Sequence, residues 1–340
     1  MKKTFVALAV LAASGASFAQ VAITGTYAFG YRADTSKTGG ASSGLGVDTS
    51  TLNFTATEDL GGGTKVTAVM GFDGLYRGTT NAGDSYVTVA GNFGTVKMSV
   101  ARGADYLSGG TAGVAGFGLD GLLFSALWAG DAIAYTSPSF SGFNVSLTHE
   151  EITPNIESTV QGVGIGYGDA GAYPGNYQRR NGIGFKYTGG PLVVDGAYQA
   201  YDQQGVAPAA DNTATGTASP NFVSRTRLSG AYDFGVAKLG AGIDSRQLTS
   251  GSRVDTLIGA YVPFGAASVG VEFGTRKYDG TGQGRLEGTR NGSAIVANYA
   301  LSKRTSVQGF YVKYDNVTLN AVNSTKQSAD RTEVQLIHSF

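Results

Sequence analysis

The feature that most constrains this chain is an alternation of apolar and polar residues with a period of two. In the segment 21–32, Val21, Ile23 and Tyr27 share one parity, while Thr24 and Thr26 share the other. Side chains of a β-strand alternate between two faces, whereas an amphipathic helix repeats every 3.6 residues. The segment is therefore predicted to be a strand with one apolar face and one polar face.

The same alternation recurs along the whole chain, which lacks long amphipathic helical windows. A soluble β-sandwich would show similar alternation, but the length of these segments and the nature of the N-terminus favour a different solution. No apolar stretch after the N-terminus approaches the length of a transmembrane helix. Further alternating segments cover residues 65–73, 96–100, 143–148, 182–187, 225–232, 238–246, 268–276 and 331–340.

The N-terminus has the layout of a secretory signal peptide. Lys2 and Lys3 precede the apolar run 5–13, and the small-residue site Ser17-Phe18-Ala19 follows. The apolar run is too short for a membrane anchor. We expect residues 1–19 to be removed and residues 20–340 to form one domain. Because lipid cannot hydrogen-bond backbone groups, an exported chain that crosses a membrane with strands must close them into a barrel.

The connections between the alternating segments are short and long in turn, as in outer-membrane barrels. Gly, Pro, Asn, Asp and Ser dominate the short ones, which are turn residues. The seven short turns lie near 58–62, 91–94, 137–140, 188–191, 233–235, 263–265 and 302–305. The eight longer connections lie near 34–48, 74–84, 103–131, 149–178, 202–221, 247–253, 277–291 and 315–329. This order predicts an all-β fold, a 16-stranded antiparallel transmembrane β-barrel, which is wide enough for an aqueous channel.

The last predicted strand, 331–340, places Val334, Leu336, His338 and Phe340 on the apolar face. A terminal Phe is suited to the aromatic girdle at the membrane interface. Pairing of this strand with the first would remove the free edge of the sheet.

Charge and residue counts exclude several other classes of function. The 25 Lys and Arg residues balance the 25 Asp and Glu residues, so nothing favours nucleic acid as a partner. Without Cys there is no disulfide framework or thiolate metal site. The two histidines, His149 and His338, do not supply a metal site, and His149 lies in a charged loop segment. We expect no cofactor, no bound metal and no enzymatic activity.

Several segments together resemble the Gram-negative general porins, of the type found in beta-proteobacteria. They are VAITGTYAFGYR, TEDLGGGTKV, FGTVKMSV, YTSPSFSGFNVS, GFKYTGGPLVVDGAYQ, YALSKRTSVQGFYVKY and the ending QLIHSF. The resemblance covers essentially the whole mature chain. It implies a homotrimer of barrels, each with its own pore, in which a third external loop, here Gly103 to Asp131, folds into the lumen.

The resemblance also implies an acidic group on this loop opposite a ladder of Arg and Lys on the wall. The alternation nominates inward cations for that ladder, and the loop offers two candidate acids, Asp120 and, in reserve, Asp105. Locally paired, unrelated lumen charges are the alternative for the ladder, and a turn cap is the alternative for Asp120. The nominated wall residues are Arg32, Lys65, Arg102, Arg225, Arg227 and Arg246.

Two departures from the family pattern concern the same region. Val100 stands where the family usually has a wall arginine, and Arg102 is its possible substitute. The loop is also rich in Gly and apolar residues. Its stretch Leu122, Leu123, Phe124, Leu127 and Trp128 is predicted to pack against the barrel wall.

These observations predict a passive diffusion channel of the Gram-negative outer membrane for ions and small hydrophilic solutes, with a weak preference for anions. The expected surroundings are outer-membrane lipid and lipopolysaccharide. Substrate-selective uptake is the alternative. A barrel hydrolase or an adhesin is disfavoured, because no Ser-His pair is evident near His149 and the longest external loop is short.

Overall fold

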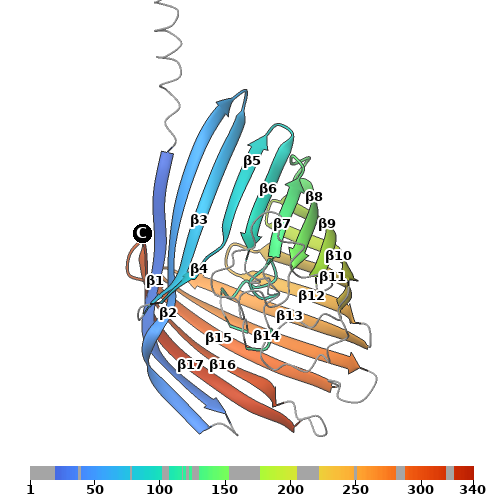
Figure 1. Ribbon diagram of the computed structural model, residues 1–340. Coiled ribbons are helices and arrows are strands. Elements are labelled where there is room, and N and C mark those ends of the chain that lie inside the picture. Colours follow the sequence, from blue (N-terminus) through green and yellow to red (C-terminus); the bar gives the residue numbers. More distant parts are fainter. Residues whose placement is uncertain are drawn as a thin grey trace, which may run out of the picture.

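The chain folds into a closed antiparallel sheet in which strands adjacent in sequence pair with one another. The computed structural model describes residues 20–36, 40–76, 79–101, 107–116, 118–119, 122–124, 130–152, 177–204, 222–248, 251–280, 288–318 and 325–340. The first strand, β1 (Gln20–Ser36), pairs with both β2 (Gly40–Gly61) and the last strand, β17 (Thr325–Ser339). Figure 1 shows the first and last strands, β1 and β17, side by side, and their pairing closes the sheet into a barrel.

The remaining strands follow one another round the barrel in chain order (Figure 1). Within the described ranges, no helix has the length and apolar character needed to cross a membrane. The strands are β3 (Thr64–Tyr76), β4 (Thr79–Ala82), β5 (Ser85–Gly91), β6 (Gly94–Ala101), β7 (Gly130–Thr136), β8 (Phe143–Ile152), β9 (Tyr177–Gly189), β10 (Leu192–Gln204), β11 (Phe222–Asp233), β12 (Lys238–Leu248), β13 (Gly251–Phe264), β14 (Ala267–Gly280), β15 (Gly288–Ala300) and β16 (Thr305–Thr318).

The strands β4 and β5 occupy a single position in the barrel, because both pair with β3. Between them, the backbone N–H of Gly83 donates to the carbonyl oxygen of Gly71 at 2.8 Å. A Cβ atom at Gly83 would lie only 2.6 Å from the carbonyl carbon of Gly71, so glycine permits this close approach. With β4 and β5 counted as one interrupted strand, the predicted 16-stranded antiparallel barrel is confirmed.

All seven predicted short turns are present, and they lie at one end of the barrel, here called the turn side. The predicted long connections at 34–48, 74–84, 247–253, 277–291 and 315–329 are wrong in their extent, because strands occupy much of each. The chain remains paired to Ser36 and resumes pairing at Gly40, and β12 ends at Leu248 only shortly before β13 begins at Gly251. Small Ser and Gly residues resemble a loop in sequence, but cross-strand pairing holds them in the sheet.

The two faces of the wall differ in side-chain exposure as the alternation predicts. On β12, the side chain of Ile243 is 42% exposed, whereas the next residue, Asp244, is 1% exposed. On β14, Phe273 is 58% exposed and Glu272 is fully buried. The apolar parity therefore faces outward, toward lipid, and the polar parity faces the lumen.

The C-terminal residue completes the closure of the barrel. The backbone of Phe340 exchanges two hydrogen bonds with Gly25 of β1, both at 3.0 Å. A Cβ atom at Gly25 would lie 2.6 Å from the Phe340 ring, so glycine makes room for the aromatic side chain. Other exposed aromatic residues lie at or next to the turn side: Phe93, Phe140, Phe234, Phe264 and Tyr299. Together they match an interfacial aromatic girdle.

Candidate functional site

The most distinctive feature of the lumen is a group of arginines on the inner face of β11 to β14. Register places Arg225 opposite Arg246, and Arg246 opposite Arg253. In the adjacent inward row, Arg227 lies opposite Asp244, Asp244 opposite Asp255, and Asp255 opposite Arg276. We call this group the arginine cluster: Arg225, Arg227, Arg246, Arg253 and Arg276 with Asp244 and Asp255.

Asp244 is the centre of one half of the cluster. Its carboxylate accepts hydrogen bonds from Arg225 at 2.6 Å, from Arg227 at 2.7 Å and from Arg246 at 3.1 Å. The Asp244 side chain is 1% exposed, and those of Arg225 and Arg246 are 4% and 3% exposed. Charge-assisted bonds of this kind hold several guanidinium groups in a defined geometry.

Asp255 is the centre of the other half. Arg276 donates to both of its carboxylate oxygens at 2.7 Å, in the bidentate arrangement that suits a guanidinium. Arg253 lies 3.8 Å from the same carboxylate. Arg276 also lies 5.7 Å from the ring centre of Phe124, at the edge of the third loop.

The cluster is locally basic. Its five guanidinium groups face two carboxylates, a surplus of three positive charges among its members. Charges beside a narrow aqueous path with low-dielectric walls act on passing ions more strongly than charges on an open surface. This arrangement can attract anions and resist cations.

A further buried cation, separate from the arginine cluster, lies on β9. Arg180 pairs with Glu150 of β8, and its guanidinium lies 5.7 Å from the ring centre of Tyr201. Arg180, Arg253 and Arg276 were not among the predicted wall residues. Arg276 lay in the inward parity of its segment, but parity alone did not distinguish it from other lumen cations.

The structure brings three of the predicted wall residues together, Arg225, Arg227 and Arg246. Arg32 faces the lumen from β1, but it pairs with Asp34 at 3.0 Å, and Arg331 of β17 approaches the same carboxylate at 2.6 Å. Arg32 therefore belongs to a separate ion-pair group, whose residues lie on β1 and β17.

Lys65 also faces the lumen, but it lies at the turn side of β3, two residues from Gly63. The arginine cluster lies in the opposite half of its strands, so the structure does not bring Lys65 to the cluster. Arg102, Asp105 and Asp120 lie outside the described residues. Val100 is 56% exposed on the outward face of β6 and therefore does not face the lumen. Lys97 of the same strand does face the lumen.

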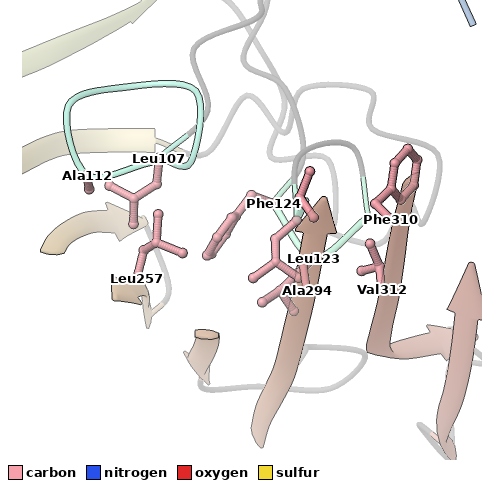
Figure 2. Packing of buried hydrophobic residues seen from close by; sticks show 10 residues of the cluster. Leu107, Ala112, Leu123, Phe124, Leu257, Ala294, Phe310 and Val312 are labelled. Carbon is pink, nitrogen blue, oxygen red and sulfur yellow. The ribbon is translucent and has the colours of Figure 1, made fainter. Parts of the chain in front are cut away.

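The described parts of the third loop pack on the inner face of β12 to β16. Leu107 and Ala112 lie near Leu257, while Leu123 and Phe124 lie near Ala294, Phe310 and Val312 (Figure 2). Leu123 is 2% exposed and Phe124 is fully buried. The prediction that this apolar stretch packs on the barrel wall is confirmed for Leu122, Leu123 and Phe124, while Leu127 and Trp128 lie outside the described residues.

Inward-facing glycines form the floor beneath the loop. A Cβ atom at Gly240 would lie 2.3 Å from the backbone oxygen of Ala112, and one at Gly270 would lie 2.7 Å from the Cα atom of Ala115. A Cβ atom at Gly274 would lie 2.7 Å from the Leu119 side chain. The loop can approach the wall this closely only because side chains are missing there. We call Gly240, Gly242, Gly270, Gly274 and Gly292 the glycine floor.

The inner face of β2 to β6 is different. We call its residues Thr55, Thr57, Thr67, Thr88, Thr95 and Ser99 the hydroxyl wall, since register places all of them on the lumen side. The hydroxyls of Thr57 and Thr67 lie 3.2 Å apart. Lys97 is the cation nearest the middle of this wall, and its ammonium lies 4.3 Å from the ring centre of Tyr86.

Neither histidine belongs to this lining. The prediction that His149 lies in a loop segment is wrong, because cross-strand pairing holds it within β8. It lies opposite Ile133 and Asn181 on the outward face, and its Nδ1 atom is 2.7 Å from the Asn181 side-chain oxygen. His338 is also outward and lies 2.9 Å from the hydroxyl of Thr305. Within the part of the chain that the structure describes, no group of three or more His, Cys, Asp or Glu residues is arranged to hold a metal ion.

Comparisons with known proteins agree with this geometry. A family model described as Gram-negative porin matches residues 6–319. The outer membrane porin protein 32 of Delftia acidovorans is 29% identical over 341 aligned residues, which cover 91% of this chain and 88% of that protein.

Solved structures show the same fold at lower identity. The anion-selective porin from Comamonas acidovorans has a TM-score of 0.65 at 20% identity, covering 95% of this chain and all of that one. The in-vitro folded OmpT of Vibrio cholerae, in its trimer form, has a TM-score of 0.62 at 13% identity, covering 94% of this chain and 99% of that one.

Proposed function

Because the chain belongs to the Gram-negative porin family and is a passive diffusion channel of the outer membrane, we propose that its lumen favours anions and small anionic solutes. The arginine cluster carries this proposal. All its members except the partly buried Arg227 are buried in the wall, and together they hold more positive than negative charge. A relative in structure is described as anion-selective, which supports the same direction of selectivity.

We further propose that the third loop narrows the lumen and places Asp105 and Asp120 opposite the arginine cluster. The neighbours of both acids support this. Leu107 lies against Gly242, and Leu119 lies against Gly274, which is the inward residue next to Arg276. Asp105 precedes Leu107 by two residues and Asp120 directly follows Leu119 in the sequence, which supports this placement. Arg102, at the start of the loop, is proposed to add to the basic side.

The assembly and processing of the chain are proposed from the same family. A homotrimer is the expected state, since OmpT, a relative in fold, has a trimer form. Outer-membrane lipid and lipopolysaccharide are the proposed surroundings of the apolar face. The two lysines, the apolar run 5–13 and the small-residue site Ser17-Phe18-Ala19 support removal of residues 1–19 as a signal peptide. N-terminal sequencing of the mature protein tests this cleavage site.

A catalytic role is not proposed. A lipid hydrolase on a barrel needs a hydroxyl nucleophile beside an outward histidine. The described outward positions around His149 are Ile133, Leu147, Glu151 and Asn181, none of which carries a hydroxyl. His338 does lie beside the Thr305 hydroxyl, but its cross-strand neighbour on the other side is Tyr27 and not the carboxylate that a catalytic triad needs. Substrate-selective uptake and an adhesin role are the alternatives, and neither is favoured by an observation as specific as the charge pattern of the lumen.

The decisive experiment is the reversal potential of the mature protein in a planar bilayer across a salt gradient. The variants are Arg227→Gln in the cluster and Arg32→Gln outside it, which remove the same charge. We expect anion preference in the wild type and a clearly weaker preference in Arg227→Gln than in Arg32→Gln. Cation preference in the wild type, or an equal effect of the two variants, would contradict the proposal.

A further inference from the structure

The outward face of β10 to β13 contains a groove with a cavity volume of about 640 Å³. It lies on the side of the wall opposite the lumen, because all its bulky lining residues except Leu257 have the outward parity. Its outward residues include Val194, Leu228, Gly230, Tyr232, Ala241 and Ile258.

Strand register explains why the wall is hollow at this place. Gly230 and Ala241 lie directly opposite each other, and Val194 and Ile258 flank them on the neighbouring strands. The outward rows on either side contain large residues. Leu228 lies opposite Ile243 toward the loop side, and Tyr232 lies opposite Leu239 toward the turn side. Two small residues thus form the floor of a groove with an apolar rim.

The position of the groove along the strands identifies the membrane leaflet that it faces. Tyr232 and Leu239 are next to the short turn at 234–237, and short turns of such barrels are periplasmic. Four residues separate Tyr232 from Leu228, which corresponds to about 14 Å along a strand. The apolar band of such a barrel is about 25 Å tall and its strands are tilted. The groove therefore lies in the periplasmic half of the band.

We propose that this groove binds an acyl chain of a glycerophospholipid from the periplasmic leaflet of the outer membrane. The bilayer core holds no water, so a void in the lipid-facing wall must be filled by hydrocarbon or lose its packing contacts. The groove is continuous with the surface that faces lipid, and its rim offers aliphatic and aromatic contacts along its length. Its periplasmic position favours a phospholipid over lipopolysaccharide, which occupies the other leaflet.

The proposal is tested by filling the groove. A Cβ atom at Gly230 would have its nearest neighbours at 3.5 and 3.7 Å, so Gly230→Leu should fold and place its side chain in the groove. Ala241→Leu fills the facing half and serves as a second variant. Gly309→Leu is the matched control, since Gly309 is outward on β16 and a Cβ atom there has its nearest neighbour at 3.7 Å.

The measurement is native mass spectrometry of each protein after extraction from vesicles of phosphatidylethanolamine and phosphatidylglycerol, with lipopolysaccharide added in a parallel sample. We expect phospholipid to remain on the wild type and on Gly309→Leu and to be lost from both filling variants. Conductance should be unchanged in all of them, because the groove faces away from the lumen.

Three results would overturn the proposal. One is phospholipid that remains bound to both filling variants. A second is preferential retention of lipopolysaccharide by the wild type and its loss on filling. The third is a wild-type assembly without bound lipid that dissociates in the filling variants, since that would make the groove a contact between copies of the chain. Ion selectivity plays no part in any of these readouts, so they are independent of the proposed anion preference.

Discussion

The strands β11 to β14 and the strands β2 to β6 follow the same alternation, yet they line the lumen with different chemistry. The first set carries the arginine cluster, in which Asp244 and Asp255 organise five guanidinium groups. The second set carries the hydroxyl wall, where Thr57 and Thr67 contact each other. The outward apolar residues of each strand specify the barrel. The inward residues can therefore differ from one part of the wall to another, according to function.

The two walls also differ in how they are supported. The glycine floor lies on the same side of the barrel as the arginine cluster, and the apolar third loop packs on it. Close packing on glycines and apolar burial hold the loop, whereas ion pairs hold the neighbouring arginine cluster. Among the residues that the structure describes, the hydroxyl wall shows neither feature, which makes it a suitable control in experiments on the cluster.

The largest effect is expected from Asp244→Asn. The substitution leaves three guanidinium groups without their shared carboxylate, and breaking a buried ion pair on one side costs about 3–5 kcal/mol. The free energy of unfolding, measured by denaturant titration in detergent, should fall accordingly. Asp34→Asn is the control. Because the Asp34 side chain is 29% exposed, this variant should lose much less free energy of unfolding. Equal losses in the two variants would show that the cluster has no special role in stability.

A smaller effect is expected from Gly240→Leu in the glycine floor. A side chain there must displace the backbone of Ala112, and overpacking of this kind costs about 1–3 kcal/mol. The displaced loop should also make the single-channel current unsteady. Gly46→Leu is the control, because Gly46 has the lumen parity on β2 and a Cβ atom there meets nothing within 4 Å. A steady current and full stability in Gly240→Leu would mean that the loop does not depend on this contact.

The dependence of ion selectivity on salt concentration should distinguish the two walls, and this measurement does not require the protein to be destabilised. The Debye length falls from about 10 Å at 0.1 M salt to about 3 Å at 1 M, so anion preference from the cluster should weaken over this range. Arg227→Gln should show a shallower dependence, while Lys97→Gln, on the hydroxyl side, should resemble the wild type. Reversal potentials at a fixed salt ratio and rising mean concentration give the comparison. A preference that does not change with salt would point to pore size rather than charge.

The smallest effect is expected from Thr57→Val on the hydroxyl wall. It removes the contact with Thr67 in a lumen that water can reach, and the net value of such a hydrogen bond is about 1 kcal/mol or less. Stability should fall slightly and the reversal potential should not move. A shift in selectivity equal to that of Arg227→Gln would refute the division of the lumen into two walls.

Much of the fold was predictable, because period-two alternation and short turns depend on residues close in sequence. The seven turns, the strand count and the pairing of the last strand with the first all followed from local patterns. The extent of β1 and β2 could not be predicted in this way. The Ser and Gly residues at 40–46 have a weak preference for strands, and pairing with β1 holds them in the sheet. The break between β4 and β5 likewise depends on a contact between Gly71 and Gly83.

The sequence by itself determined which residues face lipid and which face the lumen, since parity along a strand settles this. Only the tertiary structure decided which lumen residues meet. Cross-strand register placed Arg253 and Arg276 beside the predicted Arg225 and Arg246, and it left Lys65 at the far end of the wall. Register depends on pairing between strands. The position of the third loop on the wall depends on glycines more than one hundred residues away in the sequence. Neither relation can be read from the alternation within a single segment.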